Sequence, residues 1–251
     1  MAKTAFPGFP AEALAFFRSL ARNNKRDWFE AHRETYLEQV KAPMIALVTA
    51  LSRDMMEFAP AHVTEPEKAI FRIYRDTRFS KDKTPYKTHI AAIFPRRGLP
   101  KHGGAAYYVS VSHKEVEIAG GIYMPPPDVL FAVRQHVAAR HEQFRQLCGS
   151  TAVKNLFGSL HGEQASRVPK GFSRDHPAAD LLRYRYYLLD SVLDPAVATS
   201  AALYREVLKR FQAMAPFIDF LNAPLVATAK PRKAFLFSAG FQTGKVKDSP
   251  R

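Results

Sequence analysis

The sequence is poor in cysteine and in long apolar runs. Cys148 is the only cysteine among 251 residues, so a disulfide within the chain and a zinc site built from several cysteines are both excluded. No run approaches the roughly 18 apolar residues that a membrane-spanning helix requires. The apolar N-terminal stretch is interrupted by Pro7, Pro10 and Glu12, unlike the core of a signal peptide. We therefore expect a soluble protein, without a membrane segment, in the reducing cytoplasm.

Acidic residues are also scarce. Against 37 Lys and Arg the chain has 23 Asp and Glu, which gives a formal charge of +14. The field of such a chain raises the local concentration of anions, and this favours nucleic acid, phosphorylated ligands or an acidic surface as partners. The alternative is that the charge only keeps the protein soluble. The nine histidines contain no HExxH-type spacing, and we expect no metal site.

Helical spacing of apolar residues occurs in several separate segments of the chain. It predicts helical structure over 14–20, 25–56, 128–147, 153–160 and 203–221. A break is expected near Pro43, because proline lacks the N–H that a helix interior needs.

Alternation with period two begins at residue 69, where Phe71 and Ile73 share one face of a predicted strand and Arg72 and Tyr74 the other. Further strands are predicted over 88–94, 106–112, 115–123 and 181–189. The polar link at 112–114 is compatible with a tight hairpin, and connections this short require antiparallel neighbours. Residues 1–223 therefore predict one α+β domain, a mainly antiparallel sheet covered by helices. Residues 224–251 predict a basic C-terminal tail, with an appended strand as the alternative.

The segment FRIYRDTRFSKDKTPYKTH, residues 71–89, concentrates cations. Between Arg72 and Lys87 six cations and two carboxylates leave a net charge of +4. Beyond Arg75 the segment is rich in turn formers and is predicted to be a loop leaving a strand end. Guanidinium forks and ammonium groups suit phosphate or carboxylate. The ligand-binding candidates are therefore Arg72, Arg75, Arg78, Lys81, Lys83, Tyr86 and Lys87.

Three residues of this segment are catalytic candidates. Asp76 and Asp82 can orient the arginines, act as acid or base, or hold a magnesium ion. His89 titrates near neutral pH and can act as a base. The structural alternative is a solvated loop in which the two Asp satisfy neighbouring Arg and the aromatic residues anchor the loop in the core.

The run RIYRDTRFSKDKTPYKTH closely resembles the signature of the DUF2461 family of uncharacterised proteins. Other matching parts are Asn23-Asn24-Lys25 with Trp28-Phe29, YYVSV at 107–111, Gly120-Gly121-Ile122-Tyr123, and Pro169-Lys170-Gly171-Phe172 leading to Asp175-His176-Pro177. The resemblance covers roughly residues 8–223 and implies one α+β domain, but no established activity, substrate or cofactor. It adds Phe79, Ser80 and Pro85 to the candidates, with Asn24 and Trp28 second, since these can be a helix cap and a core aromatic.

Three hypotheses for function follow. The first is a protein that binds an anionic, phosphorylated ligand through the cationic strand-end loop. The second is nucleic-acid binding, which the global charge and the interleaved aromatic residues favour. The third is an enzyme acting on a phosphorylated substrate with Asp76 or Asp82 as acid, base or magnesium ligand. Gly120 and Gly121 are explained either by close approach of a ligand or by a bulge in the strand.

Overall fold

The computed structural model describes residues 6–100 and 103–228. Its strands are β1 (His89–Phe94), β2 (Ala106–Ser112), β3 (Val116–Ile122) and β4 (Tyr187–Leu193). Its α-helices are α1 (Ala11–Arg22), α2 (Arg26–Ala31), α3 (Arg33–Thr35), α4 (Ala42–Met55), α5 (Pro66–Ala69), α6 (Pro127–Ala139), α7 (His141–Gly149), α8 (Thr151–Phe157), α9 (Ala179–Leu182) and α10 (Ala202–Thr228). A π-helical turn covers Tyr36–Lys41, and 3₁₀ turns cover Pro60–His62 and Pro195–Thr199.

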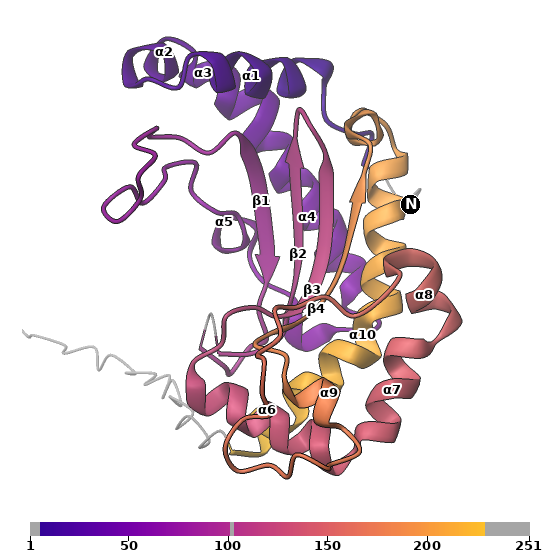
Figure 1. Ribbon diagram of the computed structural model, residues 1–251. Coiled ribbons are helices and arrows are strands. Elements are labelled where there is room, and N and C mark those ends of the chain that lie inside the picture. The colour runs from indigo at the N-terminus through magenta and orange to yellow at the C-terminus, as the bar shows by residue number, and fades with distance from the viewer. Residues whose placement is uncertain (1–5, 101–102, 229–251) are drawn as a thin grey trace, which may run out of the picture.

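The four strands form one antiparallel sheet in the order β1-β2-β3-β4. The turn between β2 and β3 is tight, because Ser112 and Glu115 already exchange backbone and side-chain hydrogen bonds. By contrast, β4 joins β3 only after the chain has formed α6 to α9 (Figure 1). The α+β fold, with a mainly antiparallel sheet, is therefore confirmed.

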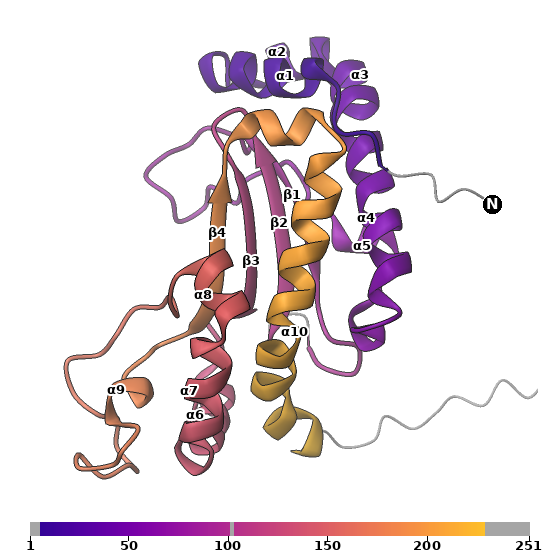
Figure 2. The same ribbon diagram turned by 90° about the vertical axis from the view of Figure 1, so that its right-hand side faces the viewer.

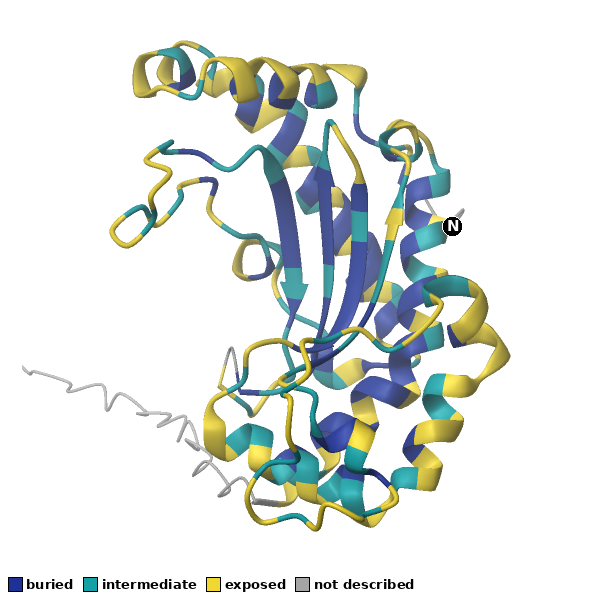
Figure 3. Cartoon of the chain, viewed as in Figure 1, coloured by how far each residue is buried: buried dark blue, intermediate teal, exposed yellow. Residues whose placement is uncertain are grey.

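Two long helices cover one face of the sheet. Figure 2 shows α4 and α10 side by side on one side of the strands, with α1 to α3 at one end of the sheet and α6 to α9 at the other. Tyr107 and Val109 of β2 point towards these helices and are fully buried, and the ring of Tyr107 packs 4.9 Å from that of Phe211 in α10. Accordingly, β1, β2 and β3 are buried along most of their length, whereas most of β4 is half-buried or exposed (Figure 3). None of the helices in the described part of the chain is both long and apolar enough to cross a membrane.

The predicted helices are present with sharper breaks than the sequence indicates. The segment 25–56 is divided at His32 and again by the π-helical turn that precedes α4. Pro43 lies in the first turn of α4, where its missing N–H costs no helical hydrogen bond. The segment 128–147 is likewise two helices, α6 and α7, which meet at Arg140.

The strand predicted from residue 69 is wrong as a regular strand. Residues 70–88, here called the arm, leave α5, project from the β1 edge and return to β1 (Figure 1). Ile70 bridges Ala92 and Tyr74 bridges Tyr86, but these bridges are isolated. The predicted alternation survives, since Ile73 is buried while Arg72 and Tyr74 are exposed. A longer ladder is blocked because the returning strand contains Pro85, which has no N–H to donate.

The strand predicted over 181–189 is also displaced. The chain is helical in α9 and becomes a strand only at Tyr187. Tyr187 pairs with Ile122, the last residue of β3. Beyond Ile122 the partner strand ends, because Met124 adopts a φ of 44° and three prolines follow it. Residues before Tyr187 therefore have no partner in β3, and Tyr184 instead forms an isolated bridge with Gln164.

The closing helix continues past the predicted domain boundary at residue 223. α10 ends at Thr228, and Leu225 is still part of the core. The remainder of the predicted tail, residues 229–251, lies outside the described residues.

Candidate functional site

The second face of the sheet is left uncovered by the described helices and carries a groove. Side chains alternate along β2, so Tyr108 and Ser110 lie on this face while Tyr107 and Val109 face the helices. The arm bounds the face along β1. At the β4 edge, His161 pairs with Leu188 through backbone hydrogen bonds in both directions. The sheet thus lies between two irregular segments, the arm at the β1 edge and the segment around His161 at the β4 edge.

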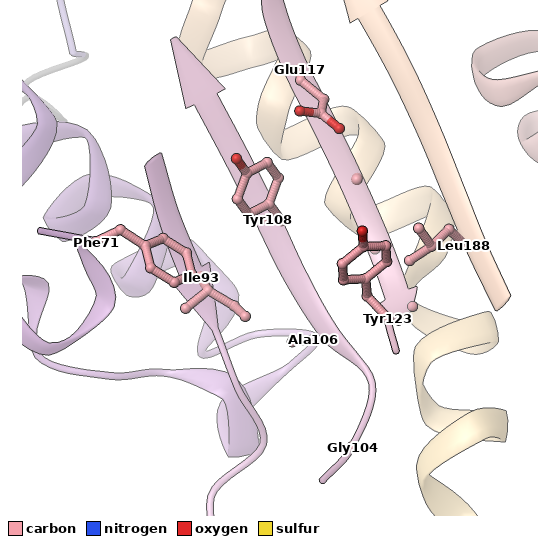
Figure 4. A pocket seen from close by; sticks show the side chains of 11 residues that line it. Phe71, Ile93, Gly104, Ala106, Tyr108, Glu117, Tyr123 and Leu188 are labelled. Atoms are coloured by element: carbon pink, nitrogen blue, oxygen red, sulfur yellow. The ribbon is translucent and has the colours of Figure 1, made fainter. Parts of the chain in front are cut away.

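The groove has a volume of about 500 Å³. It is lined by Phe71, Ile93, Gly104, Ala106, Tyr108, Glu117, Ala119, Gly120, Gly121, Tyr123 and Leu188. Figure 4 shows the rings of Phe71, Tyr108 and Tyr123 around one space, with the Glu117 carboxylate towards one end. The small residues leave the floor flat, and the aromatic rings provide apolar walls. Such a space suits a compact molecule with a planar or apolar body.

The glycine pair in β3 is required for packing. A Cβ at Gly120 would lie 2.1 Å from the sulfur of Met214 in α10, so the glycine lets this helix approach the sheet. Gly121 has a φ of 138°, and its Cβ would lie 2.1 Å from the carbonyl oxygen of Tyr187. Both residues keep their partners in the β3–β4 ladder, which is continuous and has no bulge here.

Glu117 is the charged residue among the eleven described residues that line the groove. Loss of hydration raises the pKa of its carboxyl, and the negative charges of Asp190 and Glu115 raise it further, while a hydrogen bond from Ser110 acts in the opposite direction. The carboxylate of Asp190 is itself in contact with the Nδ1 of His161 at 2.5 Å. Glu117 can therefore accept a proton more readily than an exposed glutamate, and it can donate as well as accept a hydrogen bond.

The arm is anchored at its base by groups from α2 and from the link between α1 and α2. The side-chain amide of Asn24 accepts a hydrogen bond from the backbone N–H of Tyr86 at 3.0 Å and donates one to its carbonyl oxygen at 2.9 Å. The ring of Phe29 stacks on that of Tyr86 at 4.1 Å. Tyr86 is only 3% exposed, which leaves no ring face for a ligand. This predicted ligand-binding residue is an anchor of the arm.

Two arginines of the arm are engaged with its two aspartates. Arg75 pairs with Asp82, and Arg78 donates two hydrogen bonds to Asp76, at 3.0 and 2.8 Å. The hydrogen bonds from Arg78 lower the pKa of Asp76 to about 2. A hydrogen bond from the backbone N–H of Thr84 has the largest effect on the pKa of Asp82, and with the hydrogen bond from Arg75 it lowers this pKa to about 2. Both carboxylates stay ionised near neutral pH, so neither holds a proton to donate.

The net charge of the arm is carried by its other cations. The charges of the two Arg–Asp pairs cancel, so the net charge of +4 corresponds to the remaining cations, Arg72, Lys81, Lys83 and Lys87. The Lys83 ammonium donates to a backbone carbonyl at 2.9 Å, which leaves its charge uncompensated by that contact. The Lys87 ammonium donates to the carbonyl of Arg72 and lies 5.1 Å from the ring centroid of Phe71. Because Phe71 lines the groove, Lys87 and Arg72 lie at the end of the arm nearest to it.

The family described as "Conserved hypothetical protein (DUF2461)" matches residues 12–220. The chain belongs to this family. No match was found among curated proteins. Within the DUF2461 signature, the asparagine pair and the arm are one packed unit, because Asn24 and Phe29 hold Tyr86 in place. Asn24 is therefore a clamp on the arm, whereas Asn23 ends α1 by donating to the carbonyl of Ser19.

Two other candidates of the DUF2461 chain lie outside the groove. His89 is half-buried and is the first residue of β1, whereas Ile93 lies near the other end of that strand. Burial lowers the pKa of the His89 imidazole, and the positive charge of Lys87 lowers it further. Trp28 stacks on His32 at 4.0 Å and packs against Phe16, as a core aromatic does. Among the residues that the structure describes, no group of three His, Cys, Asp or Glu side chains is placed to hold a metal ion.

Sequence reasoning missed most of the groove. Tyr108, Glu117 and Tyr123 lie on strands that were predicted, yet none of them was a candidate. A signal was present, because period-two alternation places Tyr108, Ser110 and Glu117 on one face of two adjacent strands. The period-two alternation does not show that the described helices leave this face of the sheet uncovered.

Proposed function

We propose that this DUF2461 protein binds a small anionic, phosphorylated molecule, with its body in the groove and its charge facing the base of the arm. The observation that carries the proposal is the position of Phe71, which is at once a wall of the groove and the ring beneath the Lys87 ammonium. The arm cations thus adjoin the hollow that can hold a ligand. The cytoplasmic location expected from the single cysteine belongs to the same proposal.

The chemistry of the lining supports a ligand with two different ends. Three aromatic rings and small aliphatic residues favour an apolar or planar body. A phosphate is disfavoured beside the ionised form of Glu117, so the anionic group is directed towards Arg72 and Lys87. Phosphate binding by such cations gains from charge-assisted hydrogen bonds.

A thermal-shift screen against nucleotides, sugar phosphates and polyphosphate tests the proposal. Ligands that raise the melting temperature of the wild type are then titrated by calorimetry into Ala119→Phe and Ala119→Leu, which fill the floor of the groove, and into Arg72→Ala. We expect at least tenfold weaker binding in all three. Met56→Ala, an exposed residue at the end of α4, is the matched control. Unchanged affinity in both filling variants, or no stabilising ligand at all, would refute the proposal.

The hypothesis of an enzyme with Asp76 or Asp82 as acid or base gains no support from this geometry. Each carboxylate is held by an arginine and by backbone N–H groups of its own loop. These contacts shape the arm, and the low pKa of each group opposes proton transfer near neutral pH.

A further inference from the structure

The tip of the arm presents a bare aromatic ring. Phe79 is 94% exposed, the largest value among the exposed large hydrophobic residues described. The residues on either side of it, Thr77 to Asp82, are all polar or charged. The arm stands away from the body of the molecule, and its tip is exposed (Figures 1 and 3). A single exposed apolar side chain is ordinary on a protein surface, so what accompanies the ring at the tip decides what it can bind.

The tip is held in a defined shape. Asp76 accepts hydrogen bonds from both the backbone N–H and the guanidinium of Arg78. This places the guanidinium 5.8 Å from the ring centroid of Phe79. Lys83 ties the two sides of the loop together through the carbonyl of Thr77. The exposed ring is therefore presented by an internally bonded loop whose base is anchored in the core.

Positive charge surrounds this ring. Lys81 and Lys83 follow Phe79 in the chain, and Asp82 is the partner of Arg75. The arm thus combines one accessible π face with uncompensated lysine charges within a few residues. Proteins that bind single-stranded nucleic acid without sequence preference combine the same two elements, an aromatic platform for a base and cations for the backbone phosphates.

We propose that the arm tip binds single-stranded nucleic acid, with one base stacked on Phe79 and the adjacent phosphates at Lys81 and Lys83. The surface is separate from the groove and does not depend on the ligand proposed there. A lipid bilayer is a poorer match, because a single ring flanked only by polar residues offers little apolar area to bury. Duplex nucleic acid is also poorer, because its bases are already stacked on one another.

Fluorescence anisotropy of a labelled oligothymidylate of about 12 nucleotides tests this proposal, with the full chain at about 50 and 200 mM salt. We expect Phe79→Ala to weaken binding about tenfold or more, Phe79→Leu to do the same, and Phe79→Trp to preserve it. Leucine separates stacking from simple hydrophobicity. Phe131→Ala is the matched control, since Phe131 is 41% exposed and lies in α6, at the other end of the molecule. Lys81→Ala is expected to reduce the slope of log affinity against log salt concentration by about the amount that one phosphate contact contributes.

Several outcomes would overturn the proposal. They are absent binding at low salt, equal affinity of Phe79→Ala and wild type, and wild-type affinity in Phe79→Leu. Binding of phosphatidylserine vesicles that depends on Phe79, without binding of the oligonucleotide, would assign the tip to membranes instead. Circular dichroism of each variant checks the fold, which we expect to be unchanged for so exposed a residue. Ala119→Phe is expected to bind the oligonucleotide like the wild type, so failure of the groove proposal leaves this one intact.

Discussion

The two adjacent asparagines of the family signature provide a sharp test of how the arm is held. Asn24 makes two hydrogen bonds to the backbone of Tyr86 across 62 positions of sequence, in a partly buried setting. Asn23 makes one exposed hydrogen bond to the carbonyl of Ser19 within the same helix. Asn24→Ala therefore removes contacts between distant parts of the chain, whereas Asn23→Ala, at the neighbouring position, removes a contact within one helix.

The expected costs follow from these contacts. A net intramolecular hydrogen bond contributes about 0.5–1.5 kcal/mol, so Asn24→Ala is expected to lower the free energy of unfolding by about 1–3 kcal/mol. Asn23→Ala is expected to cost about 0.5 kcal/mol, because water replaces an exposed bond at little cost. For a domain of this size, 1 kcal/mol corresponds to about 2–4 °C in melting temperature.

Urea unfolding and limited trypsin digestion measure the two effects. The arm contains six trypsin sites, counting Arg72 through Lys87. We expect Asn24→Ala to be cut faster within the arm, while Asn23→Ala is cut at the wild-type rate. If Asn23→Ala proved as destabilising as Asn24→Ala, or if trypsin cleaved both variants alike, the clamp would not be what holds the arm.

Burial lowers the pKa of the His62 imidazole below its ordinary value of 6.5, so folding favours the neutral form. The contribution of this group to the free energy of unfolding is therefore fully present above pH 6.5 and is lost as the pH falls below that value. Urea titrations over this range should show a flatter dependence for His62→Gln. Gly121→Ala is expected to cost more than about 2 kcal/mol in urea unfolding, because a left-handed φ and contact with the Tyr187 carbonyl add together. Gly120→Ala, whose Cβ meets a flexible methionine, is expected to cost less. Burial raises the pKa of Cys148 to about 12, so a thiol reagent at pH 8 should label the native protein more than about tenfold slower than the unfolded chain.

The local part of the fold could be predicted from the sequence, because its signals are local. Alternation over 106–112 and 116–122 and a short polar turn are sufficient for a hairpin. The pairing of Ile122 with Tyr187 spans 65 positions and depends on α6 to α9 in between. No periodicity records where β3 ends, and the strand at 181–189 was therefore placed too early.

The candidate site shows the same limit. The cations of the arm are visible in the sequence, but their pairing is not: Arg75 reaches Asp82 and Arg78 turns back to Asp76. The groove brings Phe71 together with Glu117 and Leu188, residues from three separate segments. Such a space exists only once the sheet is assembled and one face has been left open, so composition and spacing cannot reveal it.

The structure separates two kinds of residue within the signature, and this decides how substitutions in it are to be interpreted. Arg75 pairs with Asp82, and Asn24 binds the backbone of Tyr86, so loss of any of these side-chain contacts alters the shape of the arm before it alters any contact with a ligand. A binding defect in Arg75→Ala therefore does not place a ligand at Arg75, since Asp82→Ala would break the same pair. A direct contact requires the two variants to differ, because only the arginine can meet an anion.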